Sequence, residues 1–342
     1  MKRFFCAAAV LITSALDPTL AHADIWSQLD SRVRALIEKQ QDRFEIHIED
    51  VRSKRLLTYG EKQPVYMAST IKIFVLIEVM RQISLGKIQP EQKLMFREAD
   101  RRDGSPVNEW TRPGTPITVQ THMHRMMIYS DNSSTDILIN LAGIEKINST
   151  AKKYFPNGNF KITSMLQVRR LAYSQFHPGA ASLAADAFSR IKKQPHSKRL
   201  DQLAKELQVE RSALTRLDLY QGWEAYYNEG QNTSNIETLA KVMKKLARGE
   251  IVSPEVSYRI LEIMSLCQTG KMRLVAGLKA GYTLSHKTGT QIRRACDAGV
   301  IRKNGQPRLV VAVCARQYPS LRKIEETMAE ITKSIFDSGV LP

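Results

Sequence analysis

A hydroxyl and an amine lie one helical turn apart in the segment ASTIKIFVLIEVM, residues 68–80. Ser69 and Lys72 would share one face of a helix, because residues three apart on a helix are neighbours. From Ile71 to Met80 the only other charge is Glu78, so the lysine sits in an apolar run. A buried ammonium costs free energy unless its surroundings compensate for it. Either Lys72 reaches water from the edge of the core, or a pocket holds it and lowers its pKa so that it accepts a proton.

Two further short motifs carry hydroxyl and amine groups. The tripeptide Ser130–Asn132 occurs in MMIYSDNSSTDILINLAG, at a predicted turn that enters a helix. The tetrapeptide Lys287–Thr290 occurs in GYTLSHKTGTQIRR, on a predicted strand. Each is unremarkable alone, as a helix N-cap cluster or a strand end. Their joint presence after the serine–lysine pair, in this order and on these element types, indicates one site.

The elements that must position these motifs follow from hydrophobic periodicity. Residues 43–60 alternate in strand fashion in two runs, and residues 282–316 contain three more strands, the last two joined by an Asn304–Gly305 hairpin turn. Between them lie about 200 residues with mainly helical periodicity and no convincing strand. We therefore predict an α+β fold: one discontinuous sheet of five mainly antiparallel strands flanked by terminal helices, plus an all-helical body. The crevice between the two bodies is the expected site.

The same pattern predicts the domain boundaries. Residues 24–66 and 271–342 would form the sheet subdomain, and residues 67–270 the helical subdomain. Within the latter, residues 171–222 contain two amphipathic, basic helical segments without obvious chemistry, and we interpret this stretch as a surface insertion. Its role would be structural, or it would bind a partner or the cell wall.

The first 23 residues have the composition of a signal peptide: Lys2 and Arg3, an apolar stretch and an Ala-His-Ala cleavage site ending at Ala23. We expect a mature chain that starts at Asp24 and is exported to the periplasm or secreted. No later segment is apolar for long enough to span a membrane.

The formal net charge of +17 could indicate nucleic acid, an anionic membrane or acidic wall material as a partner. No zinc-finger spacing or RNA-binding signature accompanies it, so we expect no nucleic-acid partner and at most weak affinity for anionic envelope material. No His or Cys cluster has metal-ligand spacing. We expect a monomer without a metal or cofactor. Of the cysteines in the expected mature chain, Cys296 and Cys314 would face each other across the hairpin and pair, or else Cys267, Cys296 and Cys314 are all buried thiols.

The three motifs together resemble those of the class A β-lactamases, within the serine penicillin-recognising enzymes. The resemblance covers nearly the whole expected mature chain and includes RPGTPITV at 112–119, RLVAGLKAGYTLSHKTGT at 273–290 and DAGVI at 297–301. It implies that Ser69 is the nucleophile, that Lys72 is its activating base and that Ser130 passes a proton to the departing lactam nitrogen.

The resemblance also implies how the substrate would be held. Asn132 would bind Lys72 and the side-chain amide of the substrate, and Lys287 would anchor the substrate carboxylate. Thr288 and Thr290 would supply hydroxyls, and Gly289 would let the substrate backbone approach the strand. The backbone N–H groups of Ser69 and Thr290 would form the oxyanion hole.

Release of the acyl group needs a carboxylate, which the family carries in a Glu-x-x-Leu-Asn loop. Residues 164–176, at the usual spacing, contain no acid. Glu224 and Asn228 have the required separation further on, with Tyr227 in place of the leucine, as if residues 171–222 were inserted before the loop. Either Glu224 is the base that activates the deacylating water, with Asn228 beside it, or it is a solvated acid on an amphipathic stretch.

Three functions remain open from the sequence. The first is a serine β-lactamase acylated at Ser69 and deacylated through Glu224. The second is a penicillin-binding D,D-peptidase or esterase of the same fold, acting on a peptidoglycan peptide with slow deacylation. The third is a non-catalytic envelope-binding protein that uses the basic insertion.

Overall fold

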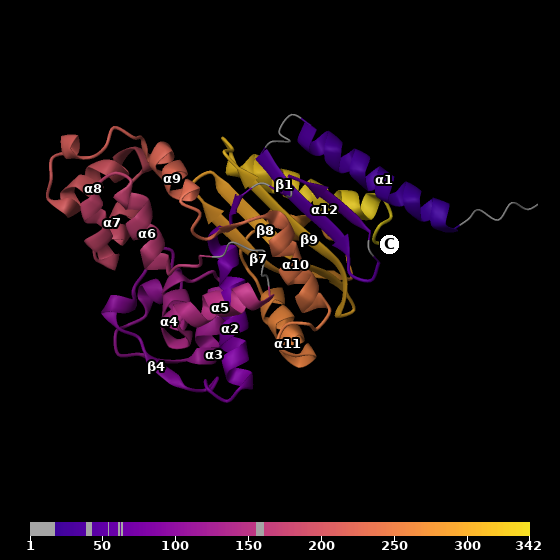
Figure 1. Ribbon diagram of the computed structural model, residues 1–342, viewed down its shortest axis with the longest axis horizontal. Coiled ribbons are helices and arrows are strands. Elements are labelled where there is room, and N and C mark those ends of the chain that lie inside the picture. The colour runs from indigo at the N-terminus through magenta and orange to yellow at the C-terminus, as the bar shows by residue number, and fades with distance from the viewer. Residues whose placement is uncertain (1–17, 39–42, 54, 61, 63, 155–160) are drawn as a thin grey trace, which may run out of the picture.

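The computed structural model describes residues 18–38, 43–53, 55–60, 62, 64–154 and 161–342 (Figure 1). Most of the predicted signal peptide, residues 1–17, lies outside this part of the chain, and the first helix, α1, begins at Pro18. Within the described ranges, no helix is both long and apolar enough to cross a membrane.

One antiparallel sheet joins the two ends of the chain. Its strands run in the order β2-β1-β9-β8-β7, and every neighbouring pair is antiparallel. The bounds are β1 (Phe44–Asp50), β2 (Leu56–Tyr59), β7 (Tyr282–Gln291), β8 (Arg294–Lys303) and β9 (Gln306–Arg316). Both residues of the predicted hairpin turn between β8 and β9, Asn304 and Gly305, have positive φ, as a tight two-residue turn requires. The predicted five-stranded split sheet is confirmed.

Two terminal helices cover one face of this sheet. Helix α1 (Pro18–Ile37) and helix α12 (Leu321–Asp337) lie side by side across it (Figure 1). Leu29 and Val33 of α1 pack with Ile331 and Ile335 of α12 in a core that also holds the strand residues facing them. The alternation that predicts each strand therefore follows from burial of one set of side chains under these helices.

The helical body packs against the other face of the sheet. Helix α10 lies on β1, β8 and β9, and α11 contacts β7 and α2. The bounds are α2 (Lys72–Ser84), α3 (Val119–Ile128), α4 (Asn132–Ala142), α5 (Ile144–Tyr154), α10 (Ile236–Ala247) and α11 (Pro254–Ser265). The central region also contains two-stranded pairs that periodicity does not predict, β3 (Val65–Tyr66) with β6 (Thr233–Ser234) and β4 (Lys93–Met95) with β5 (Pro116–Thr118). Strands of two or three residues are too short to show an alternation.

The basic stretch at 171–222 belongs to a lobe beside the helical body, drawn in rose and salmon in Figure 1. The lobe comprises α6 (Met165–Ser174), α7 (Ala185–Lys193), α8 (Arg199–Leu207) and α9 (Leu219–Asn228). It has its own core, in which Phe176 packs so closely on Gly222 that a Cβ on this glycine would lie 2.0 Å from the ring. The two amphipathic segments noted in the sequence are α7 and α8.

A disulfide joins Cys296 and Cys314, which pair directly in the β8–β9 register. Cys267 is a free thiol. Of the two interpretations of the cysteines, the structure therefore shows the hairpin pair.

Candidate active site

The serine and the lysine lie at the junction of a short 3-10 turn, η2 (Ala68–Ile71), with helix α2. Ser69 lines a cleft of about 630 Å³, a size that suits a small-molecule ligand. In the described part of the chain no residue forms a hydrogen bond with the Ser69 hydroxyl, which leaves it open to a substrate. Lys72 begins α2 and is completely buried.

Lys72 is buried with its donors satisfied. Its Nζ donates to the Oδ1 of Asn132 at 2.7 Å, and to the carbonyl and the hydroxyl of Ser130 at 2.5 and 3.1 Å. Of the two interpretations of Lys72, the structure therefore shows the pocket. Burial lowers the pKa of the Lys72 amine well below its usual range, and the positive charge of Lys287 lowers it further. The lowered pKa favours the neutral amine, which can accept a proton and act as a base.

Ser130 bridges the two amines. Its Oγ accepts hydrogen bonds from Lys72 Nζ at 3.1 Å and from Lys287 Nζ at 3.0 Å. Ser130 has a φ of 60°, in the left-handed region, and the next residue, Asp131, caps helix α4 by accepting from the N–H of Ser134. The strained backbone at 130 aims the hydroxyl between the amines, a placement suited to relaying a proton.

Lys287 is the second buried amine. Its Nζ also donates to the carbonyl of Thr288 at 2.9 Å, and burial lowers its pKa to about 8. No carboxylate contacts Lys287 in the part of the chain that the structure describes, so its charge faces Ser130 and the cleft. This arrangement favours an anionic substrate group beside Ser130.

Gly289 lies where strand β7 meets the turn that carries Ser69. A Cβ at this position would lie 2.5 Å from the carbonyl oxygen of Met67 and 3.1 Å from the backbone N of Ser69. The glycine therefore allows strand β7 to pack against the turn that carries the nucleophile. The close approach is made by the chain itself, and it brings the N–H of Ser69 next to the strand of Thr290.

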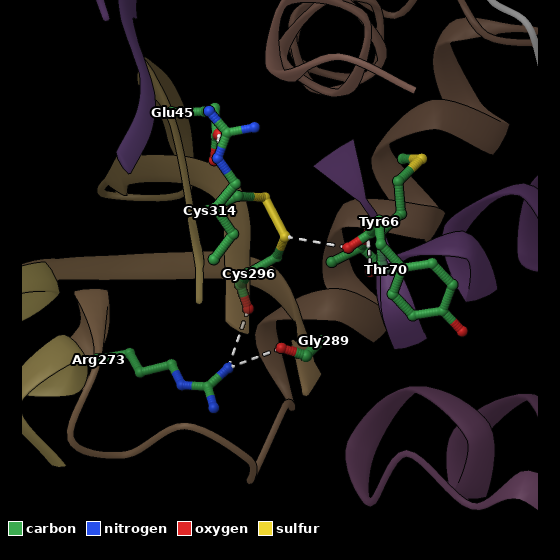
Figure 2. Close-up of a disulfide and its surroundings, with 9 residues drawn as sticks. Glu45, Tyr66, Thr70, Arg273, Gly289, Cys296 and Cys314 are labelled. Carbon is green, nitrogen blue, oxygen red and sulfur yellow. Dashed lines mark hydrogen bonds and ion pairs between the residues drawn. A yellow bond between two sulfur atoms is a disulfide. The ribbon is translucent and has the colours of Figure 1, made fainter. Parts of the chain in front are cut away.

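Arg273 was not predicted as a site residue. It is almost fully buried and donates to the carbonyls of Gly289 at 3.1 Å and Cys296 at 2.9 Å (Figure 2). Its Nη2 donates to the Thr290 hydroxyl at 2.6 Å, and its Nε pairs with Glu325. Arginine fixes geometry with several donors at once, so this side chain holds the end of β7 in place and directs the threonine. An arginine isolated in a loop gives no periodic signal in the sequence.

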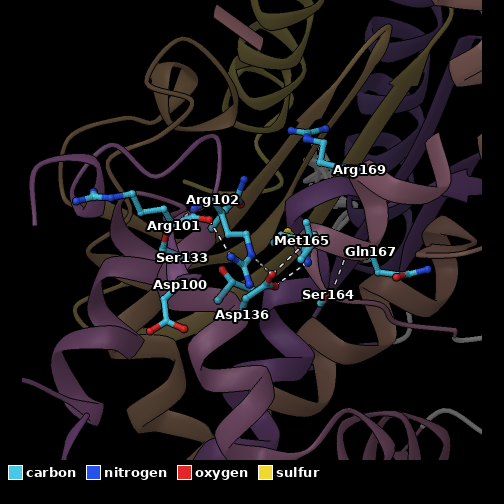
Figure 3. Close-up of polar contacts among 12 residues, drawn as sticks. Asp100, Arg101, Arg102, Ser133, Asp136, Ser164, Met165, Gln167 and Arg169 are labelled. Carbon is cyan, nitrogen blue, oxygen red and sulfur yellow. Dashed lines mark hydrogen bonds and ion pairs between the residues drawn. The ribbon is translucent and has the colours of Figure 1, made fainter. Parts of the chain in front are cut away.

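Asp136 is a second unpredicted residue and anchors a wall of the cleft. Its carboxylate accepts from the backbone N–H groups of Met165 and Leu166, at the start of α6, and from Arg102 Nε (Figure 3). A carboxylate is favoured at a helix N-terminus, where N–H groups point outward. Met165 lines the cleft, so this contact sets one of its boundaries.

Five of the predicted site residues line the cleft together: Ser69, Ser130, Asn132, Thr288 and Thr290. Lys72 and Lys287 lie directly behind Ser130. The structure thus brings the three sequence motifs to one place.

The structure does not bring Glu224 and Asn228 to this place. The Glu224 carboxylate forms two hydrogen bonds with Arg294, at 2.9 and 2.7 Å, and Asn228 is exposed at the end of α9. Trp223 and Tyr227 occupy the buried face of α9, and the helical period turns positions 224 and 228 to its flank. Among the described residues that line the cleft, none is Asp or Glu.

In residues 164–176, the segment at the usual spacing for the family's acid, Val168 and Arg169 of α6 line the cleft. Arg169 donates to both carboxylate oxygens of Asp103, with distances of 2.7 to 3.0 Å. Asn232, which also lines the cleft, accepts from the backbone N–H of Thr163 and donates to the Thr163 hydroxyl. An amide–hydroxyl contact therefore joins the segment before α6 to Asn232, and the described residues of this part of the cleft include no acid.

Comparisons with known proteins identify the family of the chain. A model of the β-lactamase enzyme family matches residues 28–338. β-Lactamase SME-1 of Serratia marcescens is 22% identical over 322 residues, which cover 93% of this chain and 92% of the relative. β-Lactamase PSE-4 of Pseudomonas aeruginosa is 24% identical over 141 residues, 41% of this chain, and the chain spans about half (48%) of its length.

Solved structures share the fold. A β-lactamase from Sphaerobacter thermophilus superposes with a TM-score of 0.67 at 19% identity, over 93% of this chain and 99% of the other. PBP-A, a mutant of which is described as an acyl-enzyme complex with penicillin G, superposes with a TM-score of 0.66 at 20% identity, over 92% and 96%. At these identities the structures establish the fold alone. The match of the family model to most of the chain goes further, and the chain belongs to the β-lactamase enzyme family.

Proposed function

We propose that the protein is a serine hydrolase of the penicillin-recognising type, acylated at Ser69 by β-lactams and releasing the acyl group slowly to water. The observation that carries this proposal is the Ser130 hydroxyl held between two buried amines, Lys72 and Lys287. An apolar protein interior does not retain two such amines without a function, because each costs desolvation energy.

The residues supply each step of acylation. Neutral Lys72 accepts the proton of Ser69, whose Oγ attacks the lactam carbonyl carbon. The C–N bond of the lactam then breaks, and Ser130 donates its proton to the nitrogen while it recovers one from Lys72. The products are a Ser69 ester and a ring-opened amine, with no net gain or loss of protons. The N–H groups of Ser69 and Thr290 stabilise the intermediate oxyanion.

Substrate anchors lie on both sides of the serine. Lys287, with the hydroxyls of Thr288 and Thr290, binds the substrate carboxylate, and Asn132 binds the side-chain amide. A β-lactam and a D-alanyl peptide of peptidoglycan both carry an amide and a carboxylate, so either can use these anchors.

Slow release is favoured by the absence of a carboxylate from the described lining of the cleft. Glu224 is engaged by Arg294 and Asn228 is exposed, so neither is placed to orient a water at the ester. The second candidate is a β-lactamase in which the Arg294 pair opens and Glu224 turns to activate the deacylating water, with Asn228 beside it. The family membership favours this candidate.

Intact-mass spectrometry over time after addition of benzylpenicillin separates the two. We expect a single adduct of penicillin mass that persists for minutes to hours and is missing in Ser69→Ala. We expect Glu224→Gln to leave the lifetime of the adduct unchanged. A transient adduct that becomes persistent in Glu224→Gln would establish the β-lactamase mechanism, and no adduct in the wild type would refute the proposal.

Export belongs to the same proposal. The composition of residues 1–23 and the habit of the family favour a periplasmic or secreted enzyme, acting as a monomer on small substrates, with weak affinity for anionic envelope material through its net charge of +17. N-terminal sequencing of the exported protein, with Asp24 as the expected first residue, tests the cleavage.

A further inference from the structure

The lobe formed by α6 to α9 contributes one wall of the cleft, and residues 171–222 supply much of that wall. Lys192 at the end of α7, His196 in the 3-10 turn η6 (His196–Lys198), Arg199 at the start of α8 and Tyr220 of α9 all line it. Arg293, in the turn between β7 and β8, completes this wall, with its guanidinium 3.9 Å from the centroid of the Tyr220 ring. We call these five residues the insertion wall.

The insertion wall carries positive charge that its neighbours only partly neutralise. The nearest carboxylate, Asp103, is engaged by Arg169 in two-pronged fashion and lies 3.7 Å from Lys192 Nζ. Arg199 donates only to the backbone carbonyls of Gln194 and Lys192 in the described part of the chain. Partial burial lowers the pKa of Lys192, the attraction of Asp103 opposes this shift, and repulsion from Arg169 and Arg199 adds to it.

The insertion wall begins where the side chain of a substrate would leave the serine. The point at which Gly104 would carry a Cβ lies 2.8 Å from Asn132 Nδ2 and 3.1 Å from Lys192 Nζ. Asn132 is the proposed partner of the side-chain amide, so Lys192 is the next polar group along the cleft. Lys287 and Arg273, by contrast, contact Thr288 and Thr290 on the strand side.

We propose that the insertion wall binds a carboxylate on the side chain of the acyl donor, so that the enzyme prefers substrates with a second negative charge. This inference rests on acylation at Ser69 as proposed above. A carboxylate beside Lys192 and Arg199 would gain hydrogen bonds to charged donors in a partly enclosed cleft, where such contacts are stronger than in open water. The preference would then be a property of the insertion, because the lobe supplies both side chains.

Two penicillins that differ by one carboxylate test this inference. Benzylpenicillin and α-carboxybenzylpenicillin share the ring system, and only the second carries an acid on its side chain. We expect the second-order acylation constant of α-carboxybenzylpenicillin divided by that of benzylpenicillin, measured by intact mass, to fall by about tenfold in the double variant Lys192→Gln/Arg199→Gln, because each partly exposed ion pair contributes about threefold. Raising the salt concentration should reduce the ratio in the wild type.

Lys193→Gln/Lys198→Gln is the matched control, since both lysines are exposed neighbours of the insertion wall and their replacement removes the same two charges without changing the cleft lining. Its ratio should equal that of the wild type. An unchanged ratio in the double variant, with acylation intact, would overturn the insertion wall as a carboxylate site and leave the proposed function standing. No acylation of the wild type by either penicillin would overturn the proposed function itself. Far-UV circular dichroism and the melting temperature exclude a folding defect as the cause.

Discussion

Replacement of Asp136 by asparagine should destabilise the protein by an amount that the structure allows us to estimate. The side chain is 2% exposed, and its two oxygens accept from Met165 N at 2.6 Å, Leu166 N at 3.1 Å and Arg102 Nε at 2.7 Å. Figure 3 shows Arg102 and Met165 meeting at the carboxylate from two different segments of the chain. Asparagine keeps the shape, loses the charge and turns an NH2 group toward one of the donors.

The loss should be about 3–5 kcal/mol, the cost of removing one partner from a buried ion pair. Arg102 is only 9% exposed in its side chain and would lose its charged partner. Each hydrogen bond to a charged acceptor is worth roughly 1.5–3 kcal/mol, about twice a neutral one, and α6 also loses the favourable charge at its N-terminus. Such a loss is a large part of a total stability of about 5–15 kcal/mol.

Urea unfolding followed by circular dichroism measures this loss through the shift of the midpoint at constant slope. Asp186→Asn is the control: it removes an acid paired with Arg190, but its side chain is 63% exposed, so we expect at most about 1 kcal/mol. If Asp136→Asn cost no more than the control, the carboxylate would not hold α6 in place. The account of this cleft wall would then be refuted.

Three further predictions concern titratable groups and the disulfide. Acylation by benzylpenicillin should accelerate as the pH rises through the lowered pKa of Lys72, and Lys72→Met should slow it by roughly 10²–10⁴-fold. A wild-type rate that does not change with pH would contradict this role. Burial raises the pKa of the Cys267 thiol, but its hydrogen bond with His286 and the charge of that ring bring the pKa down to about 7. Alkylation by iodoacetamide should therefore be half-maximal near pH 7 and shift to higher pH in His286→Asn. Equal alkylation midpoints in the wild type and the variant would exclude the pairing of Cys267 with His286. Removing the disulfide as Cys296→Ala/Cys314→Ala should cost about 3 kcal/mol in urea unfolding, since the loop spans 18 residues, and dithiothreitol should lower the wild type to the level of the variant.

The sheet could be predicted because its signals are local. Alternating side chains and the Asn304–Gly305 turn fix strand positions through the backbone preferences of neighbouring residues. The short pairs β3–β6 and β4–β5 could not be predicted in this way. They exist because distant segments supply the missing backbone partners, and two or three residues carry no periodic pattern.

The pairing of Glu224 with Arg294 shows why the sequence could not predict the whole site. The spacing of Glu224 and Asn228 suits a loop, but this stretch folds as helix α9, and its aromatic residues decide which face is buried. That face is occupied by Trp223 and Tyr227, so the acid is left on the flank, within reach of Arg294. The spacing of residues in the sequence cannot predict which face of a helix meets a partner 70 residues away.

By itself, the sequence determined the split sheet, the order of the three motifs and, through them, the family, because these depend on residue type and local pattern. Only the tertiary structure decided what surrounds each reactive group. The buried Lys72 meets Ser130 and Lys287 because a helix, a turn and a strand from three parts of the chain converge. The cleft is basic and lacks a described carboxylate because the lobe of α6–α9 places Arg199 in its wall while Glu224 pairs with Arg294. Such long-range contacts set desolvation and charge, and these in turn set reactivity.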